Sequence, residues 1–144
     1  DLLVGGNYQF KPWTIYIQHP DKPDGFIVKI TITDNAVMTS GGYQRFRTLK
    51  NGKTLSHIIH PKTGMPVNSL KSITIIGKNG AAADALATAF FVLGNDSGSV
   101  MLKKMNTPYS FLSVDKDNRI LFSCGLKNKI EILDKQFTIL QCTQ

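Results

Sequence analysis

The sequence lacks the cysteines that cross-linked or metal-clustered small proteins require. It contains only two, Cys124 and Cys142, in 144 residues. Two cysteines this far apart exclude both a metal knuckle and a framework of several disulfides. We interpret them as two small apolar side chains, and a bridge between them is the less favoured alternative.

Long apolar runs and a leader are absent as well. The longest purely apolar run lies in the alanine-rich stretch around Phe90 and is far shorter than the roughly 18 residues of a membrane-spanning helix. The sequence therefore predicts no transmembrane segment. The chain begins at Asp1, without a methionine or a basic apolar leader, which is typical of a processed or truncated product and leaves secretion open.

Charge is scarce and unevenly distributed. Charged residues make up 19% of the chain and hydrophobic residues 42%, which indicates a globular protein and excludes disorder and a coiled coil. The net charge is +7, and residues 35–83 contain no Asp or Glu but seven basic residues: Arg45, Arg47, Lys50, Lys53, Lys62, Lys71 and Lys78. Such a stretch attracts phosphates, nucleic acid or an anionic membrane, although a solvated basic face has the same composition.

Alternating β-branched and aromatic residues dominate both ends of the chain. They predict strands over 13–17, 26–32, 43–49, 54–59, 72–77, 109–114, 119–123 and 136–141. Asn51-Gly52 predicts a tight hairpin turn, residues 115–118 a second turn, and the two prolines and glycine of 61–66 a loop.

Two helices follow the strand over 72–77. An alanine-rich helix is predicted over 81–93, where Gly94 ends it, and a shorter helix over 96–105. Strands, two helices and further strands predict an α+β fold with a largely antiparallel sheet, as one domain over 1–144.

Asp84 and Thr88 are the first candidate site residues. They lie four positions apart, so a helix places both oxygen-bearing side chains on one face, beside small alanines. Such a pair suits Mg²⁺, which takes few protein ligands and completes its shell with water and phosphate. In the alternative interpretation, Asp84 interacts with the helix dipole and Thr88 bonds to a backbone carbonyl.

Two further segments carry polar groups that could bind a ligand. Thr39-Ser40-Gly41-Gly42 is interpreted as a turn whose hydroxyls and N–H groups can hold an oxyanion or a phosphate. In the segment 56–64, a strand would place His57 and Ile59 on one face and Ile58 and His60 on the other. No Ser or Cys stands in the context of an activated nucleophile, so covalent catalysis has no candidate.

Taken together, these segments resemble the ApbE family of FAD:protein FMN transferases. The resemblance rests on the order and spacing of Thr39-Ser40-Gly41, 56–64, and 83–88 with Val92-Leu93-Gly94, and extends to Gly5-Gly6-Asn7 and Lys11-Pro12-Trp13. It covers nearly the whole chain and implies the C-terminal part of a T-fold-like protein. It also implies an enzyme that binds FAD and Mg²⁺, cleaves the pyrophosphate, and transfers FMN to a Thr or Ser hydroxyl of a target flavoprotein.

The resemblance assigns roles residue by residue. Asp84 and Thr88 would bind the metal, His57 would lie in the active site, and Ile59 would contact the flavin nucleotide. We expect further nucleotide contacts from Thr39, Ser40, Gly41 and Thr63. Family members usually work outside the cytoplasmic membrane, often as lipoproteins, so the resemblance implies an extracytoplasmic, membrane-anchored protein.

Three departures separate this chain from the family pattern. His60 stands where the family usually has Asp before Pro-x-Thr-Gly, and Ala87 stands where some members have a second Asp. Members are also roughly twice as long, and their N-terminal half supplies further FAD contacts and a metal-coordinating carbonyl. We therefore expect a chain that folds but is a poor transferase until that half is supplied.

Two other functions stay open at this point. One is a flavin-binding or assembly domain without turnover. The other, less favoured, is a basic nucleic-acid-binding module that uses Tyr43, Arg45, Phe46 and Arg47 on a strand.

Overall fold

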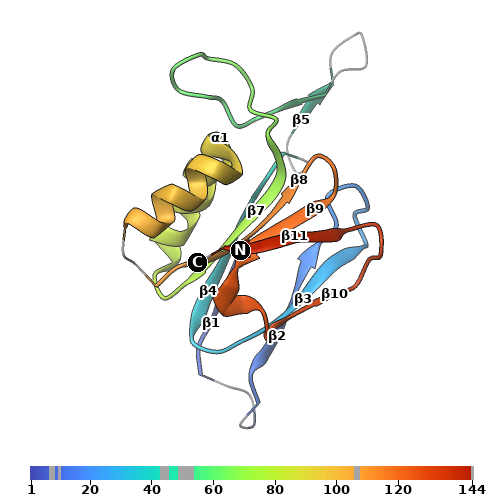
Figure 1. Ribbon diagram of the computed structural model, residues 1–144, viewed down its shortest axis with the longest axis vertical. Coiled ribbons are helices and arrows are strands. Elements are labelled where there is room, and N and C mark those ends of the chain that lie inside the picture. The colour runs from blue at the N-terminus through green and yellow to red at the C-terminus, as the bar shows by residue number, and fades with distance from the viewer. Residues whose placement is uncertain (7–8, 10, 43–45, 49–53, 106–107, 144) are drawn as a thin grey trace.

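The computed structural model describes residues 1–6, 9, 11–42, 46–48, 54–105 and 108–143. One sheet contains β1 (Leu2–Val4), β4 (Asn35–Gly41), β7 (Leu70–Gly77), β8 (Ser110–Asp115), β9 (Arg119–Ser123) and β11 (Thr138–Thr143), in the order β1-β4-β7-β8-β9-β11. A second sheet has the order β10-β3-β2, with β2 (Trp13–Gln18), β3 (Phe26–Ile32) and β10 (Ile130–Ile132). Helix α1 (Gly80–Lys104) covers one face of the six-stranded sheet, and the three-stranded sheet covers the other (Figure 1).

The central sheet separates two hydrophobic cores. In β7, Ile73 and Ile75 pack toward α1, whereas Ile76 packs toward the three-stranded sheet. In β8 the same alternation sends Phe111 to the helix side and Leu112 to the other side. The period of two along each strand thus explains why these strands are apolar almost throughout.

The predicted α+β class is confirmed. Strand pairs are antiparallel throughout the described part of the chain except β9 with β11, which run parallel. The predicted turn between β8 and β9 is present, because Asn118 has a φ of 58° and Asp115 accepts from the backbone N–H groups of Asp117 and Arg119. The Arg119 guanidinium donates a hydrogen bond to the Asp115 carboxylate, and this bond raises the pKa of Arg119.

The interpretation of Thr39-Ser40-Gly41 as a turn is wrong. These residues end β4, where Thr39 stands opposite Thr74 and Ser40 opposite Ile73 of β7. The reason is tertiary: Val37 packs into one core and Met38 against the other, so the segment is held extended between two layers.

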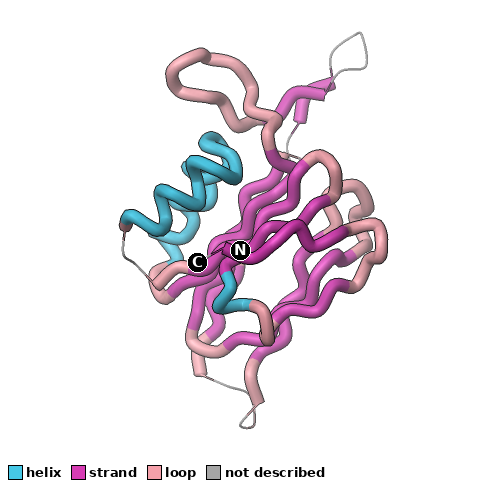
Figure 2. The backbone as a smooth tube through the Cα atoms, viewed as in Figure 1, coloured by secondary structure: helices cyan, strands magenta, loops and turns pink. Residues whose placement is uncertain are grey.

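The predicted hairpin is present but shorter than expected. β5 (Phe46–Thr48) pairs antiparallel with β6 (Thr54–Ser56), and the predicted Asn51-Gly52 turn lies outside the described residues. The chain leaves the strand conformation after Ser56 and forms a long loop up to β7, which projects with the hairpin from one end of the sheets (Figure 2).

Both predicted helices are part of α1, which Gly94 divides into a first arm (residues 80–93) and a second arm (residues 95–104). Gly94 interrupts the helix with φ 74° and ψ 179°, close to the predicted end of the first helix. By length and composition alone α1 could cross a membrane, a test that a core helix also passes. Its buried residues, among them Phe90 and Phe91, pack against the sheet, which accounts for its apolar character, and the absence of a spanning segment stays a prediction.

Cys124 and Cys142 form a disulfide, contrary to the favoured interpretation of two separate apolar side chains. Cys124 begins a short 3₁₀ helix (Cys124–Leu126) directly after β9, and Cys142 lies in β11 beside it. The parallel pairing of β11 with β9 brings the two Cα atoms to 4.8 Å, a proximity that the linear spacing does not reveal.

We expect Gly94→Ala to lower the free energy of unfolding by about 1–3 kcal/mol, because the backbone region that Gly94 occupies is nearly restricted to glycine. Crowding is not the cause, since an added Cβ would meet Ser69 at an ordinary 3.7 Å. Gly125→Ala is the control, because its Cβ would meet nothing within 4 Å. Urea denaturation measures both variants, and equal effects would contradict the expectation.

Replacing both cysteines by serine should lower the free energy of unfolding by about 3 kcal/mol, the entropic value for a loop of 18 residues. Denaturant titration of the wild type with and without dithiothreitol gives the comparison. The reductant should bring the wild type to the level of the double variant and leave the variant unchanged. A wild type indifferent to reduction would show that the bridge does not contribute to stability.

Candidate functional site

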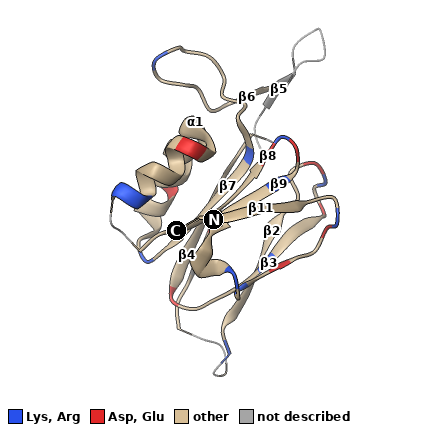
Figure 3. Cartoon of the chain, in the orientation of Figure 1, with Lys and Arg blue, Asp and Glu red and all other residues tan. Residues whose placement is uncertain are grey.

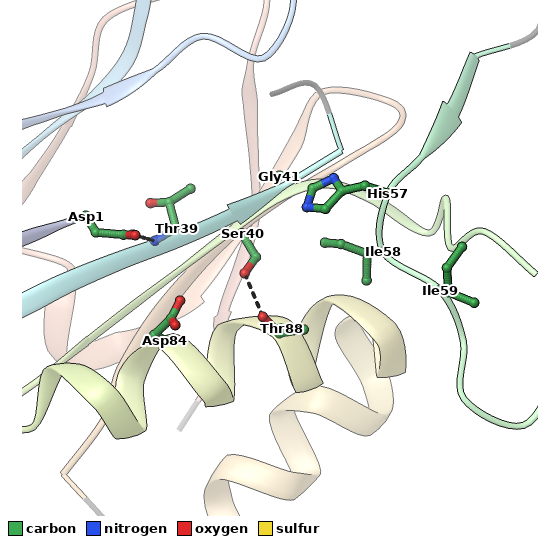
Figure 4. Close-up of a pocket in the computed structure, with 9 residues that line it drawn as sticks. All are labelled: Asp1, Thr39, Ser40, Gly41, His57, Ile58, Ile59, Asp84 and Thr88. Atoms are coloured by element: carbon green, nitrogen blue, oxygen red, sulfur yellow. Dashed lines mark hydrogen bonds between the residues drawn. The ribbon is translucent and has the colours of Figure 1, made fainter. Parts of the chain in front are cut away.

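A pocket of about 540 Å³ lies where β4, the first arm of α1 and the segment after β6 meet (Figure 4). Its lining consists of Asp1, Thr39, Ser40, Gly41, His57, Ile58, Ile59, Asp84 and Thr88. The volume falls in the range of small-molecule and cofactor sites. Segments far apart in the sequence therefore converge on a single concave surface.

The structure brings together all the predicted site residues except Thr63. Thr63 lies in the loop over residues 60–66, where its hydroxyl accepts from the backbone N–H of Met65 at 3.3 Å. Two lining residues, Asp1 and Ile58, were not predicted. Ile58 was not predictable from the strand pattern, which places it on the face opposite His57 and Ile59.

Asp84 and Thr88 face the pocket from the first arm of α1. The side chain of Asn79 caps this helix by accepting from the Ala82 N–H at 3.0 Å, and the first turn contains no acidic residue. Asp84 therefore sits one turn too late to act as the dipole partner. The Thr88 hydroxyl bonds to the Ser40 hydroxyl rather than to a carbonyl, at 3.3 Å.

The side chains of Thr39 and Ser40 lie on opposite faces of β4. Ser40 points to α1, whereas the Thr39 hydroxyl bonds to that of Thr74 at 2.9 Å on the other face. The Thr39 N–H points along the edge of the sheet and donates to the Asp1 carboxylate at 3.2 Å. The Ser40 backbone faces β7. This strand therefore presents the Ser40 hydroxyl and the N–H at its edge to the pocket, instead of the cluster of N–H groups expected of a turn.

The segment after β6 closes the opposite side of the pocket. His57 and Ile59 are exposed, and Ile58 between them is buried in the core under α1. The alternation predicted from the sequence is thus present, although these residues follow the strand rather than belong to it.

His60, which stands where the family pattern has Asp, makes a local contact within its own turn. Its Nδ1 accepts from the Lys62 N–H at 3.2 Å, two residues on, as an aspartate oxygen does in an Asx turn. The His60 carbonyl accepts from Gly64, which has a φ of 67°. Ala87, the other departure, is fully buried in the core, so it does not border the pocket.

The three described lysines of the basic stretch, Lys62, Lys71 and Lys78, do not line the pocket. The Lys71 ammonium is bound by Asp21 at 2.6 Å and by the Asn118 amide oxygen at 2.8 Å, among loops that carry charges of both signs (Figure 3). Lys62 and Lys78 are exposed, and within the described lining no Lys or Arg occurs. The remaining basic positions are Arg45, Lys50 and Lys53, outside the described residues, and Arg47 on β5.

The oxygen donors of the pocket fit Mg²⁺ bound through few protein ligands. Asp84 supplies a carboxylate and Thr88 a hydroxyl, and both are exposed to the pocket. Among the described residues no group of three or more His, Cys, Asp or Glu could hold a metal ion, so a closed zinc or calcium cage does not fit. A cation here would keep most of its shell for water and for a phosphate ligand.

Comparison with known proteins identifies the family. Residues 1–111 match the model of the ApbE family. The chain belongs to this family. It is 33% identical over 132 residues to the FAD:protein FMN transferase of Treponema pallidum (88% of this chain, 35% of that protein). It is 37% identical over 116 residues to that of Haemophilus influenzae (79% of this chain, 33% of that protein).

The fold agrees with the sequence match. The crystal structure of an ApbE protein from Thermotoga maritima superposes with a TM-score of 0.66 at 33% identity, covering 90% of this chain and 38% of that one. The chain thus spans between 33% and 38% of the length of these three proteins.

Asp84→Asn should weaken Mg²⁺ binding about tenfold or more, because the ligand set loses its charge while the shape is kept. Stability should change little, since Asp84 is exposed and does not cap the helix. Asp96→Asn, an equal charge change on the second arm of α1, is the matched control. Calorimetric Mg²⁺ titration and thermal melting test the three proteins, each extended by the N-terminal part of a relative so that the site is complete, and equal metal affinity in all of them would contradict a ligand role.

Proposed function

We propose that this chain is the metal-binding part of an FAD:protein FMN transferase. It would move FMN from FAD to a Thr or Ser hydroxyl of a target flavoprotein. The observation that carries the proposal is the convergence of Asp84, Thr88 and His57 on one pocket in a member of the ApbE family. The names of the relatives from Treponema and Haemophilus support the same reaction.

In this reaction the hydroxyl oxygen of the acceptor replaces the bridging pyrophosphate oxygen on the phosphorus of the FMN half. The acceptor hydroxyl attacks the phosphorus of the FMN half of FAD, the bond to the bridging oxygen breaks, and AMP leaves with that oxygen. The hydroxyl proton must be removed, and we assign this task to His57, which lies across the pocket from Asp84 (Figure 4). Mg²⁺ held by Asp84 and Thr88 would neutralise charge on the phosphates.

The remaining FAD contacts would come from residues that this chain does not contain. The relatives are about three times as long as the part matched here, and the described lining offers no cationic side chain to the phosphates. We infer that a segment equivalent to their N-terminal part completes the site. We nevertheless expect the chain to fold alone, because it has two hydrophobic cores of its own.

We also propose that the protein works outside the cytoplasm. Disulfides persist in oxidising compartments and are rare in the reducing cytosol. The bridge between Cys124 and Cys142 therefore supports the extracytoplasmic location that the family resemblance implied. Attachment to a membrane stays a prediction.

Incubation with FAD, Mg²⁺ and a candidate flavoprotein tests the reaction, with chromatography of AMP and detection of flavin on the protein. The 144-residue chain alone should give little product. Its fusion to the N-terminal part of the Treponema pallidum relative should give AMP and flavinylated protein in equal amounts, and Asp84→Ala in that fusion should reduce both to background.

Other outcomes separate the alternatives. Quenching of flavin fluorescence without AMP would identify a flavin-binding domain without turnover. Salt-dependent binding of arbitrary single strands that Asp84→Ala leaves unchanged would identify a nucleic-acid module. Vigorous transfer by the chain alone would contradict the incompleteness of the site but not the reaction.

A further inference from the structure

Two hydroxyls meet across the gap between the sheet and the helix. The Ser40 Oγ of β4 and the Thr88 Oγ1 of α1 are 3.3 Å apart and form a hydrogen bond in which either can donate (Figure 4). Both side chains border the pocket that also contains the Asp84 carboxylate. The direction of this bond has chemical consequences for anything that binds there.

A cation on Thr88 would fix that direction. A hydroxyl that coordinates a cation uses a lone pair, and its hydrogen must then point away from the cation to an acceptor. Ser40 is the acceptor within reach, so Thr88 would donate and Ser40 accept. The Ser40 hydrogen would then be free for an acceptor in the pocket, and an anionic phosphate oxygen is the strongest one available.

We propose that Ser40 is a positioning residue of this site and acts through Thr88. It accepts the Thr88 hydrogen, which keeps the Thr88 lone pairs turned to the cation, and it directs its own hydrogen to a phosphate oxygen. The pair thereby sets a polarity, with the cation on the α1 side and the anion on the β4 side. This inference rests on the proposed function, because it requires a cation at Asp84 and Thr88.

The fold holds both hydroxyls in place without help from a ligand. Ser40 stands opposite Ile73 in the ladder between β4 and β7. Thr88 directly follows the fully buried Ala87, and Phe91, one turn later, is buried as well, so this arm of α1 is fixed to the sheet. Rigid support of this kind is what an outer-shell partner of a metal ligand requires.

The neighbouring residue of β4 provides an internal comparison. Thr39 and Thr74 form a similar hydroxyl pair at 2.9 Å, but on the opposite face of the sheet, and Thr74 is fully buried. Removing the Thr74 hydroxyl deletes a sheet hydrogen bond without touching Ser40 or Thr88. Thr74→Val is therefore the matched control for a structural effect.

The experiment measures Mn²⁺ binding by electron paramagnetic resonance, with competition by Mg²⁺ and in the presence of FAD. The wild type and all variants are compared within the fusion to the N-terminal part of the Treponema pallidum relative, in which the site is complete. Outer-shell partners of metal ligands typically account for a factor of roughly 10 to 100 in affinity, and we expect Ser40→Ala to weaken Mn²⁺ binding by that factor. Ser40→Thr, which restores a hydroxyl, should regain most of the affinity. Thr74→Val should bind Mn²⁺ like the wild type, and thermal melting should show Ser40→Ala to be as stable as the wild type without metal.

Three other results would each contradict the proposal. If Ser40→Ala binds Mn²⁺ like the wild type while Asp84→Asn does not, the positioning role is wrong and the proposed function stands. If Ser40→Ala and Thr74→Val lose stability and affinity in parallel, the hydroxyl is structural and the proposal fails. If the wild type does not bind Mn²⁺, the cation site itself is wrong, and with it both this inference and the metal part of the proposed function.

Discussion

The buried central strand β7 is the constraint on which the rest of the structure depends. Almost all of its residues are buried, because it has a hydrophobic core on each side. A strand in that position must pair its backbone on both edges, since an unpaired buried N–H or C=O group is costly. β4 and β8 provide those partners, and α1 packs on Ile73 and Ile75 and buries them. The alignment of Ser40 with Thr88 follows from this packing.

Regular apolar patterns made much of the fold predictable. The strand over 26–32 was predicted with its observed bounds, and so was the strand over 119–123, because their residues alternate between environments. The helix break at Gly94 was predictable from the glycine itself. β1 and β10 were not predicted, because three residues are too few to show a period and no Asn-Gly turn marks them as it marks the equally short β5 and β6. β4 was misread because Thr, Ser and Gly favour turns locally, and only its neighbours hold the segment extended.

The site shows the same division between local and long-range information. The family pattern selected residues that do converge, but it could not tell that Thr63 turns back on its own loop. The density of lysines indicated a phosphate-facing surface, yet Lys71 is bound to Asp21, which lies fifty positions earlier in the chain. The number of charged residues in a segment does not reveal which way their side chains point. That depends on partners in other loops, which lie far away in the sequence. His60, a departure from the family pattern, is the opposite case, because its Nδ1 accepts from the Lys62 N–H only two positions later in the chain.

The disulfide also decides how this protein can be handled. β11 is an edge strand of the sheet, exposes Ile139 and Leu140, and is joined by the bond between Cys142 and Cys124 to the 3₁₀ helix that directly follows β9. In a reducing host cytoplasm the disulfide would not form. Fraying of β11 would then uncover the backbone edge of β9, whose Ile120, Leu121 and Phe122 are otherwise buried. An open apolar edge of this kind templates pairing between molecules. Recombinant material made without oxidation would therefore tend to self-associate through β9, and recovery would be better after export or oxidative refolding.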